Sequence, residues 1–286
     1  MNNSVAGQRA ARRRSRNARL FNALGLTIAA AMFFPVYWMV STAFKQTPNI
    51  LSVVPRWVPF NPTLSHFVEA FTRDHFWSSV RNTIIVVGAA VLFASTLALF
   101  GAIAVARFRF RGRKLFLFSV ITVQMVPLTA MVIPLYLLLS SVNQTDKLTG
   151  IIIIYAAWTL PFTLWTLRGF VVNVPEQLEE SAMVDGCTRI GAFRRILLPL
   201  VAPGLVATSI YSVITLFNEL VIAYVVLGPP EKHTLTLWLG NFSTQRGTEW
   251  GPLMAASTLV AIPIIIFFFM VQRKVAAGLT AGAIKG

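Results

Sequence analysis

The chain has 286 residues, of which 56% are hydrophobic and only 12% are charged, and its formal net charge is +15. Soluble domains average about 25% charged residues, so this composition excludes an ordinary cytosolic fold and a disordered chain and indicates an integral membrane protein. The single cysteine, Cys187, excludes an internal disulfide, and the three scattered histidines provide no metal-binding spacing.

Six stretches are apolar and long enough to cross about 30 Å of hydrocarbon, which takes about 20 helical residues. In chain order they are 20–44, 83–106, 115–140, 148–167, 200–227 and 250–272. A β-barrel is excluded because its strands alternate in polarity, whereas these stretches are continuously apolar. No small-x-small site follows the first stretch, so we do not expect a cleaved signal peptide. The sequence therefore predicts an all-α integral membrane protein with a six-span domain, 20–272.

The basic residues predict the orientation of these spans. If the chain crosses six times, 18 of its 25 Lys and Arg residues lie on the side of both termini. They occupy the N-terminal tail 1–19, the connections 107–114 and 168–195, and the C-terminal tail 273–286. By the positive-inside rule this side is cytoplasmic. The positive charge is thus mostly explained by topology, and the basic segments 12–16 and 107–114 are also able to contact anionic lipid. No nucleic-acid partner is expected.

The connection 168–199, between the fourth and fifth stretches, does not look like a simple turn, because it holds four of the ten acidic residues. Pro175 suits the first turn of a helix, and the glutamates after it suit a helix N-terminus. Gly186 suits a left-handed helix end, and Thr188 can cap a second helix. This pattern predicts a helix–turn–helix beneath the membrane. So short a pair must pack against its own chain or against a partner, and composition alone leaves both open.

The same connection resembles the signature loop of ABC importer permeases, whose pattern is E-A-A, three residues, G, nine residues, I-x-L-P. Here the pattern reads Glu180-Ser181-Ala182, then Gly186, then Ile196 to Pro199, and Ser181 is the one departure. Other segments resemble the carbohydrate-uptake subfamily, and in particular the second, G-type permease of maltose systems: 54–71, 124–139, 160–170, 217–220 and 276–286.

The resemblance implies a type I ABC importer permease fold, with both termini cytoplasmic, in a bacterial plasma membrane. The implied partners are a second, homologous permease subunit, two cytoplasmic ATPase subunits and an extracytoplasmic solute-binding protein. The chain has no GxxxxGK[ST] phosphate loop, so we expect it to be no enzyme and to bind no cofactor, with ATP and Mg²⁺ on the ATPase. The implied cargo is a sugar or oligosaccharide, and a polyol or glycerol phosphate is the alternative.

The resemblance also makes 175–198 the segment that docks into an ATPase subunit and couples ATP hydrolysis to movement of the spans. The residues implied for this ATPase-coupling role are Glu180, Ser181, Ala182, Asp185, Gly186, Phe193 and Arg194.

Glu219, with Asn218 beside it, is the only charged residue deep within a predicted span. A charge at that depth costs about 2.5–3.5 kcal/mol on insertion scales. The pair therefore either lines the translocation pathway or makes a polar contact with a neighbouring helix, and the sequence leaves both interpretations open.

The polar connection 228–251 faces the solute-binding protein by the same resemblance, and its candidate contacts are Asn241, Gln245 and Arg246. The alternative is a solvated connection. A self-contained secondary carrier is the rival function, but such carriers commonly show two matching halves with broken helices, and no clear internal repeat is present. An intramembrane enzyme is disfavoured because all three histidines fall in predicted outer connections.

Overall fold

The computed structural model describes residues 3–245 and 247–283, with the side chains of 21–245 and 247–270. The α-helices are α1 (Asn3–Ala43), α2 (Thr47–Ile50), α3 (Ser65–Thr72), α4 (Phe76–Arg107), α5 (Arg113–Gln124), α6 (Val132–Ser141), α7 (Leu148–Asn173), α8 (Glu176–Val184), α9 (Arg189–Ala192), α10 (Leu198–Phe217), α11 (Val221–Val226), α12 (Leu235–Trp238) and α13 (Trp250–Ala283). The 3₁₀ turns are η1 (Leu128–Met131), η3 (Pro230–Lys232) and η4 (Leu239–Phe242), and η2 (Phe193–Leu197) is a π-helical turn. A hairpin of β1 (Ser243–Thr244) and β2 (Gly247–Thr248) pairs Ser243 with Thr248 and Thr244 with Gly247.

Among the described residues, five helices are long and apolar enough to cross a membrane, and a sixth crossing results if one bent pair counts as a span. The five are Phe21–Ala43, Phe76–Arg107, Leu148–Asn173, Arg189–Phe217 and Trp250–Met270, and the bent pair is Arg113–Gln124 with Leu128–Ser141. The predicted all-α membrane architecture is confirmed.

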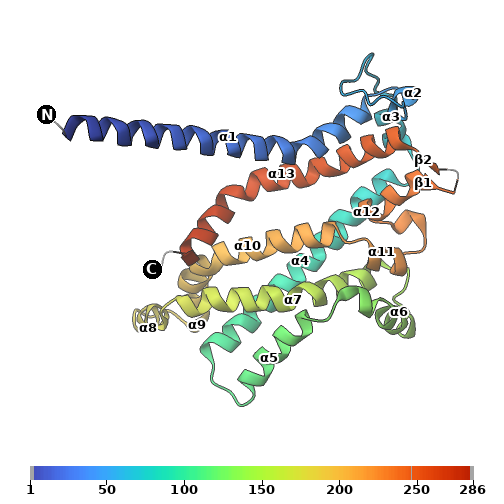
Figure 1. The fold of residues 1–286 in the computed structure, drawn as a ribbon. Coiled ribbons are helices and arrows are strands. Elements are labelled where there is room, and N and C mark those ends of the chain that lie inside the picture. Colours follow the sequence, from blue (N-terminus) through green and yellow to red (C-terminus); the bar gives the residue numbers. More distant parts are fainter. Residues whose placement is uncertain (1–2, 246, 284–286) are drawn as a thin grey trace. The chain divides into compact units, whose positions relative to one another are not determined.

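The third predicted span, 115–140, is not one continuous helix. The helix axis turns by 92° between Gln124 and Leu128, and Figure 1 shows α5 and α6 running in different directions. Pro127 lies at the break with extended backbone angles, φ −65° and ψ 128°. Proline has no N–H for the helical ladder and disfavours a helical conformation in the residue before it, which explains the break.

The fifth predicted span, 200–227, differs at both ends. On one side the helix begins at Arg189 and runs without interruption to Phe217, so it includes residues that the sequence assigned to the connection. On the other side α10 ends at Phe217, and α11 starts at Val221. Glu219 therefore lies at a break in the helix and not inside a continuous span.

The chain divides into two compact units, Met1–Thr72 with Phe242–Leu259, and Arg73–Asn241 with Val260–Gly286. In the second unit, α4 and α7 pack along their lengths, with α10 beside them (Figure 1). Two apolar clusters form its core, one around Ile151 and Tyr155 and the other around Leu167 and Leu197.

Helix α10 approaches α7 closely at Gly204. A Cβ atom at this position would lie 2.5 Å from the ring of Phe170. Glycine is therefore required here by packing, because any side chain would overlap the ring.

In the first unit, the segment after α1 folds back on that helix. The hydroxyls of Tyr37 and Ser41 both donate to the carbonyl oxygen of Trp57, at 2.7 and 3.2 Å. Lys45 is buried, with its Nζ 3.9 Å from the centre of the Trp38 ring, and burial lowers the pKa of its amine. These contacts fix the segment that follows the first span.

Candidate functional site

The signature loop, residues 175–198, consists of α8, a turn, α9 and the π turn η2. Pro175 is the residue before the helix, with an extended ψ of 131°, and does not lie in the first helical turn. In the rest of the loop, the predicted helix–turn–helix is confirmed.

Two capping motifs form the turn between α8 and α9. The N–H of Gly186 donates to the carbonyl of Met183 at 3.1 Å, and that of Cys187 donates to the carbonyl of Ala182 at 2.9 Å. This is the Schellman pattern, which needs a left-handed residue at the helix end, and Gly186 has φ +90°. Thr188 then caps the next helix, because its Oγ1 accepts a hydrogen bond from the N–H of Gly191 at 3.1 Å.

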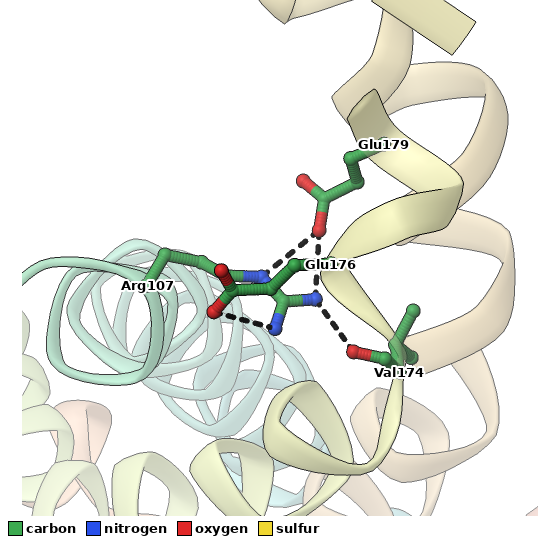
Figure 2. A network of polar contacts seen from close by, with 4 residues as sticks. All are labelled: Arg107, Val174, Glu176 and Glu179. Atoms are coloured by element: carbon green, nitrogen blue, oxygen red, sulfur yellow. Dashed lines mark hydrogen bonds and ion pairs between the residues drawn. The ribbon is translucent and has the colours of Figure 1, made fainter. Parts of the chain in front are cut away.

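The first turn of α8 contacts Arg107, the last residue of α4 (Figure 2). Its Nε and Nη2 lie 2.9 and 2.7 Å from Oε1 of Glu179, and its Nη2 also donates to the carbonyl of Val174 at 2.9 Å. Its Nη1 lies 3.7 Å from Oε1 of Glu176. The guanidinium thus joins the end of one membrane helix to the beginning of the loop.

The inner face of the loop packs on its own chain. Ala192 and Leu197 are buried and belong to this contact. Phe193 packs against the same cluster, with its ring centre 6.2 Å from that of Phe100 on α4. Phe193, expected to contact an ATPase, is therefore half-buried against α4.

The outer face of the loop carries the other candidate coupling residues. Ala182 is half-buried, and the remainder are exposed: Glu180, Ser181, Asp185, Gly186 and Arg194. Two apolar side chains of the loop are also exposed, Val184 at 87% and Ile190 at 66%. The loop thus has one face packed on its own chain and another that offers polar groups, small residues and apolar groups for contact.

Glu219 occupies the break between α10 and α11, and its carboxylate accepts three hydrogen bonds. The hydroxyl of Tyr155 on α7 donates to Oε2 at 2.6 Å, and the N–H groups of Ile222 and Ala223 donate at 2.9 and 3.2 Å. Glu219 is only 8% exposed. The arrangement is a contact between helices combined with a cap on α11. Asn218 is exposed and donates to the carbonyl of Ile214 in its own helix at 2.7 Å.

The connection that begins at Gly228 is folded onto neighbouring residues. Oδ1 of Asp146 accepts the N–H of Gly228 at 2.7 Å, and Lys232 donates to the carbonyl of Asp146 at 2.6 Å. Burial lowers the pKa of His233, although its hydrogen bond to the Gly228 carbonyl opposes that shift.

Two of the three candidate contacts for a binding protein are described. Asn241 is exposed and lies in η4, where its carbonyl accepts a hydrogen bond from Nη2 of Arg73 at 3.1 Å. Gln245 is exposed at the tip of the β1–β2 hairpin. Arg246 lies outside the described residues.

Sequence reasoning missed Arg107 and Tyr155. Each contacts residues more than 60 positions away, and no local pattern links residues so distant. The available signal for Arg107 was an arginine at the end of a predicted span, on the same predicted side of the membrane as the glutamate-rich connection 168–199.

The chain matches the family described as binding-protein-dependent transport system inner membrane component over residues 96–280. It is 49% identical over 265 residues to the diacetylchitobiose uptake system permease protein DasC of Streptomyces coelicolor, covering 93% of this chain and 96% of that protein. It is 31% identical to the trehalose/maltose transport system permease protein MalG of Thermococcus litoralis, with 91% and 94% of the two chains covered. A crystal structure of a bacterial ABC transporter that imports the acidic polysaccharide alginate has a chain of the same fold, with a TM-score of 0.79, 23% identity, and 91% and 97% of the two chains covered.

Proposed function

We propose that this chain, which belongs to the family of binding-protein-dependent transport system inner membrane components, imports a sugar or oligosaccharide through a complex whose ATPase docks on the signature loop. The chain itself is a multi-pass permease subunit and no enzyme. Its proposed partners are a second permease, two cytoplasmic ATPase subunits that bind ATP and Mg²⁺, and an extracytoplasmic solute-binding protein. The proposed orientation in a bacterial plasma membrane has both termini in the cytoplasm, because most basic residues lie on that side.

The observation that carries the docking proposal is the division of the signature loop into two faces. Its inner face is packed, while Glu180 and Ser181 remain exposed on a helix that buries no residue of its own, and Asp185 is exposed directly after that helix. A short helix of this kind gains stability from packing against a partner. The exposed apolar side chains of Val184 and Ile190 provide surface for that contact.

The same geometry supports a route for movement. The helix that begins at Arg189 in the loop continues without interruption to Phe217. A displacement of the loop by a closing ATPase pair would therefore be passed directly along α10. In this mechanism the chain converts the movement of its partner into a change of access to the pathway.

The proposed cargo class rests on the relatives. Their names specify diacetylchitobiose, trehalose and maltose, and the first belongs to the relative that shares 49% of its residues with this chain. We therefore expect uptake of a disaccharide, with diacetylchitobiose as the first compound to test. An uptake screen in a deletion strain would compare labelled diacetylchitobiose, maltose and trehalose with glycerol 3-phosphate, whose preferential uptake would overturn the sugar assignment.

The assembly is tested by tagging the chain in its native host, extracting it in mild detergent and identifying stoichiometric partners by mass spectrometry. A second permease and a nucleotide-binding ATPase are expected. Reproducible recovery of the folded chain alone would instead indicate a self-contained carrier.

The docking face is tested by Glu180→Arg, which reverses a charge on the exposed face of α8. We expect recovery of the ATPase subunit to fall by about tenfold, the effect of losing roughly 1.4 kcal/mol of binding. Glu231→Arg, a charge reversal at an exposed residue of the outer connection, is the matched control. Equal ATPase recovery with both variants would count against docking at α8.

A further inference from the structure

The two halves of the signature loop are attached to the membrane helices in different ways. The second half continues into α10 as one helix and buries Ala192 and Leu197. The first half, α8, has nine residues and buries none of them. It follows α7 through Val174 and Pro175, whose backbone is extended. Helical propensity alone does not hold so short a helix in place.

Arg107 supplies an attachment at the beginning of α8 (Figure 2). Its guanidinium reaches Val174 before the helix, Glu176 at the first helical position and Glu179 one turn later. Contacts at three successive points fix the direction of α8 as well as its position. The two carboxylates also lie where negative charge is favourable, near the N-terminus of a helix.

The attachment is shielded from water on the side of Arg107. Its side chain is 12% exposed and that of Glu179 is 20% exposed, whereas Glu176 is 58% exposed. Ion pairs that are partly buried are screened by salt less than exposed ones, and a hydrogen bond between charged groups is about twice as strong as one between neutral groups. The contact to Glu179 is therefore the strong one, and that to Glu176 adds little.

Arg107 also connects α8 to the best-packed helix of the second unit. It is the last residue of α4, which contributes buried residues to both apolar clusters. A displacement of α8 would be passed through the guanidinium into α4. The loop would then act on two membrane helices, on α10 through the continuous chain and on α4 through this polar contact.

We propose that Arg107 is a positioning residue that couples α8 to α4, so that ATP-driven movement of the signature loop moves α4 together with α10. This inference deepens the proposed function and rests on it. Lysine cannot replace the arginine, because an ammonium group is a compact point charge without the planar fork that serves several acceptors at once.

The test uses Arg107→Lys, which keeps the charge, and Glu179→Ala, which removes the partner while retaining a good helix former. The matched controls are Arg109→Lys and Gln177→Ala, both at exposed residues. The first readout is hydrogen exchange of the amides in 176–184 in the detergent-solubilised chain, which needs no partner. We expect exchange to become about tenfold faster in both test variants and to stay within about twofold in the controls. The double variant should exchange no faster than Arg107→Lys alone, because Arg107→Lys already disrupts the contact that Glu179→Ala removes.

The second readout is the amount of labelled diacetylchitobiose transported per ATP hydrolysed by the purified complex in proteoliposomes. We expect this ratio to fall by about tenfold in Arg107→Lys and Glu179→Ala while the ATPase subunit still co-purifies. If exchange does not change, or if exchange rises with an unchanged transport ratio, the coupling role of Arg107 is overturned. If the wild-type chain captures no ATPase, the proposed function itself fails, and the exchange measurement still decides whether Arg107 holds α8.

Discussion

The signature loop and the break at residues 218–220 both place acidic residues next to long apolar helices. The two regions differ in the burial and hydrogen bonding of their carboxylates. At the break, Glu219 is 8% exposed and its carboxylate is satisfied within the chain by Tyr155 and two backbone N–H groups. In the loop, Glu180 and Asp185 remain exposed, while Arg107 engages Glu179 closely and Glu176 at a longer distance. The carboxylate of Glu219 already has its hydrogen-bond donors within the chain, which indicates a structural role. The exposed acidic side chains of Glu180 and Asp185 indicate a surface that is able to bind a partner.

The largest effect on transport is expected for the substitution Gly186→Asp in the signature loop. The residue has φ +90°, where a side chain costs roughly 1–2 kcal/mol, and the new charge lies at the exposed turn. We expect transport of diacetylchitobiose to fall by at least about tenfold, an effect of 1.4 kcal/mol or more, while the protein remains in the membrane.

Membrane fractionation and labelled-sugar uptake check this prediction. Gly169→Ala is the control, because Gly169 lies within α7 and a Cβ there would meet nothing within 4 Å. Normal uptake by Gly186→Asp would contradict the functional role assigned to the signature loop.

The next effect is expected for Glu219→Gln at the break. Both carboxylate oxygens accept backbone N–H groups, but an amide has only one oxygen, so one donor loses its partner at a cost of about 1–3 kcal/mol. We expect a lower melting temperature in detergent, with transport reduced no more than stability explains. Asn218→Ala serves as the control, since an exposed substitution usually changes stability by less than about 0.5 kcal/mol.

The opposite outcome for Glu219→Gln would also be informative. Lost transport with unchanged melting would assign Glu219 to the translocation pathway, and the two regions would then both be functional.

A smaller effect is expected for Tyr155→Phe. The change removes one donor to Glu219 and leaves both backbone donors in place, so the cost should be about 1 kcal/mol. The fully buried ring keeps its packing within the apolar cluster. Thermal melting of Tyr155→Phe and Glu219→Gln, measured under the same conditions, ranks their stabilities. A larger fall in melting temperature for Tyr155→Phe would show that the backbone hydrogen bonds to Glu219 contribute little.

Local chemistry explains why the loop was predicted from sequence and the breaks were not. Gly186 and Thr188 determine their own backbone conformations and act within five residues, so their pattern is readable along the chain. Pro127 marks the bend, but prolines also lie inside the unbroken helices α1, α7, α10 and α13, so proline alone does not predict a break. The break at Glu219 lies inside an apolar stretch, whose composition indicates burial and gives no helix direction. Arg107 with Glu179, and Tyr155 with Glu219, are brought together by helix packing, which a single sequence does not report.

The π-helical turn at Phe193–Leu197 determines how the faces of α10 are oriented relative to the loop. The N–H of Leu198 donates to the carbonyl of Phe193, five residues earlier, so this turn holds one residue more than an α-helical turn. Successive residues of an α-helix are related by a rotation of about 100° about the helix axis. Insertion or deletion of one residue between Arg189 and Leu198, within the continuous helix, would therefore turn the rest of α10 by that angle and carry the buried Thr208 and Ser212 away from the core. The number of residues in this part of the signature loop thus determines the rotation of α10 about its own axis relative to the docking surface.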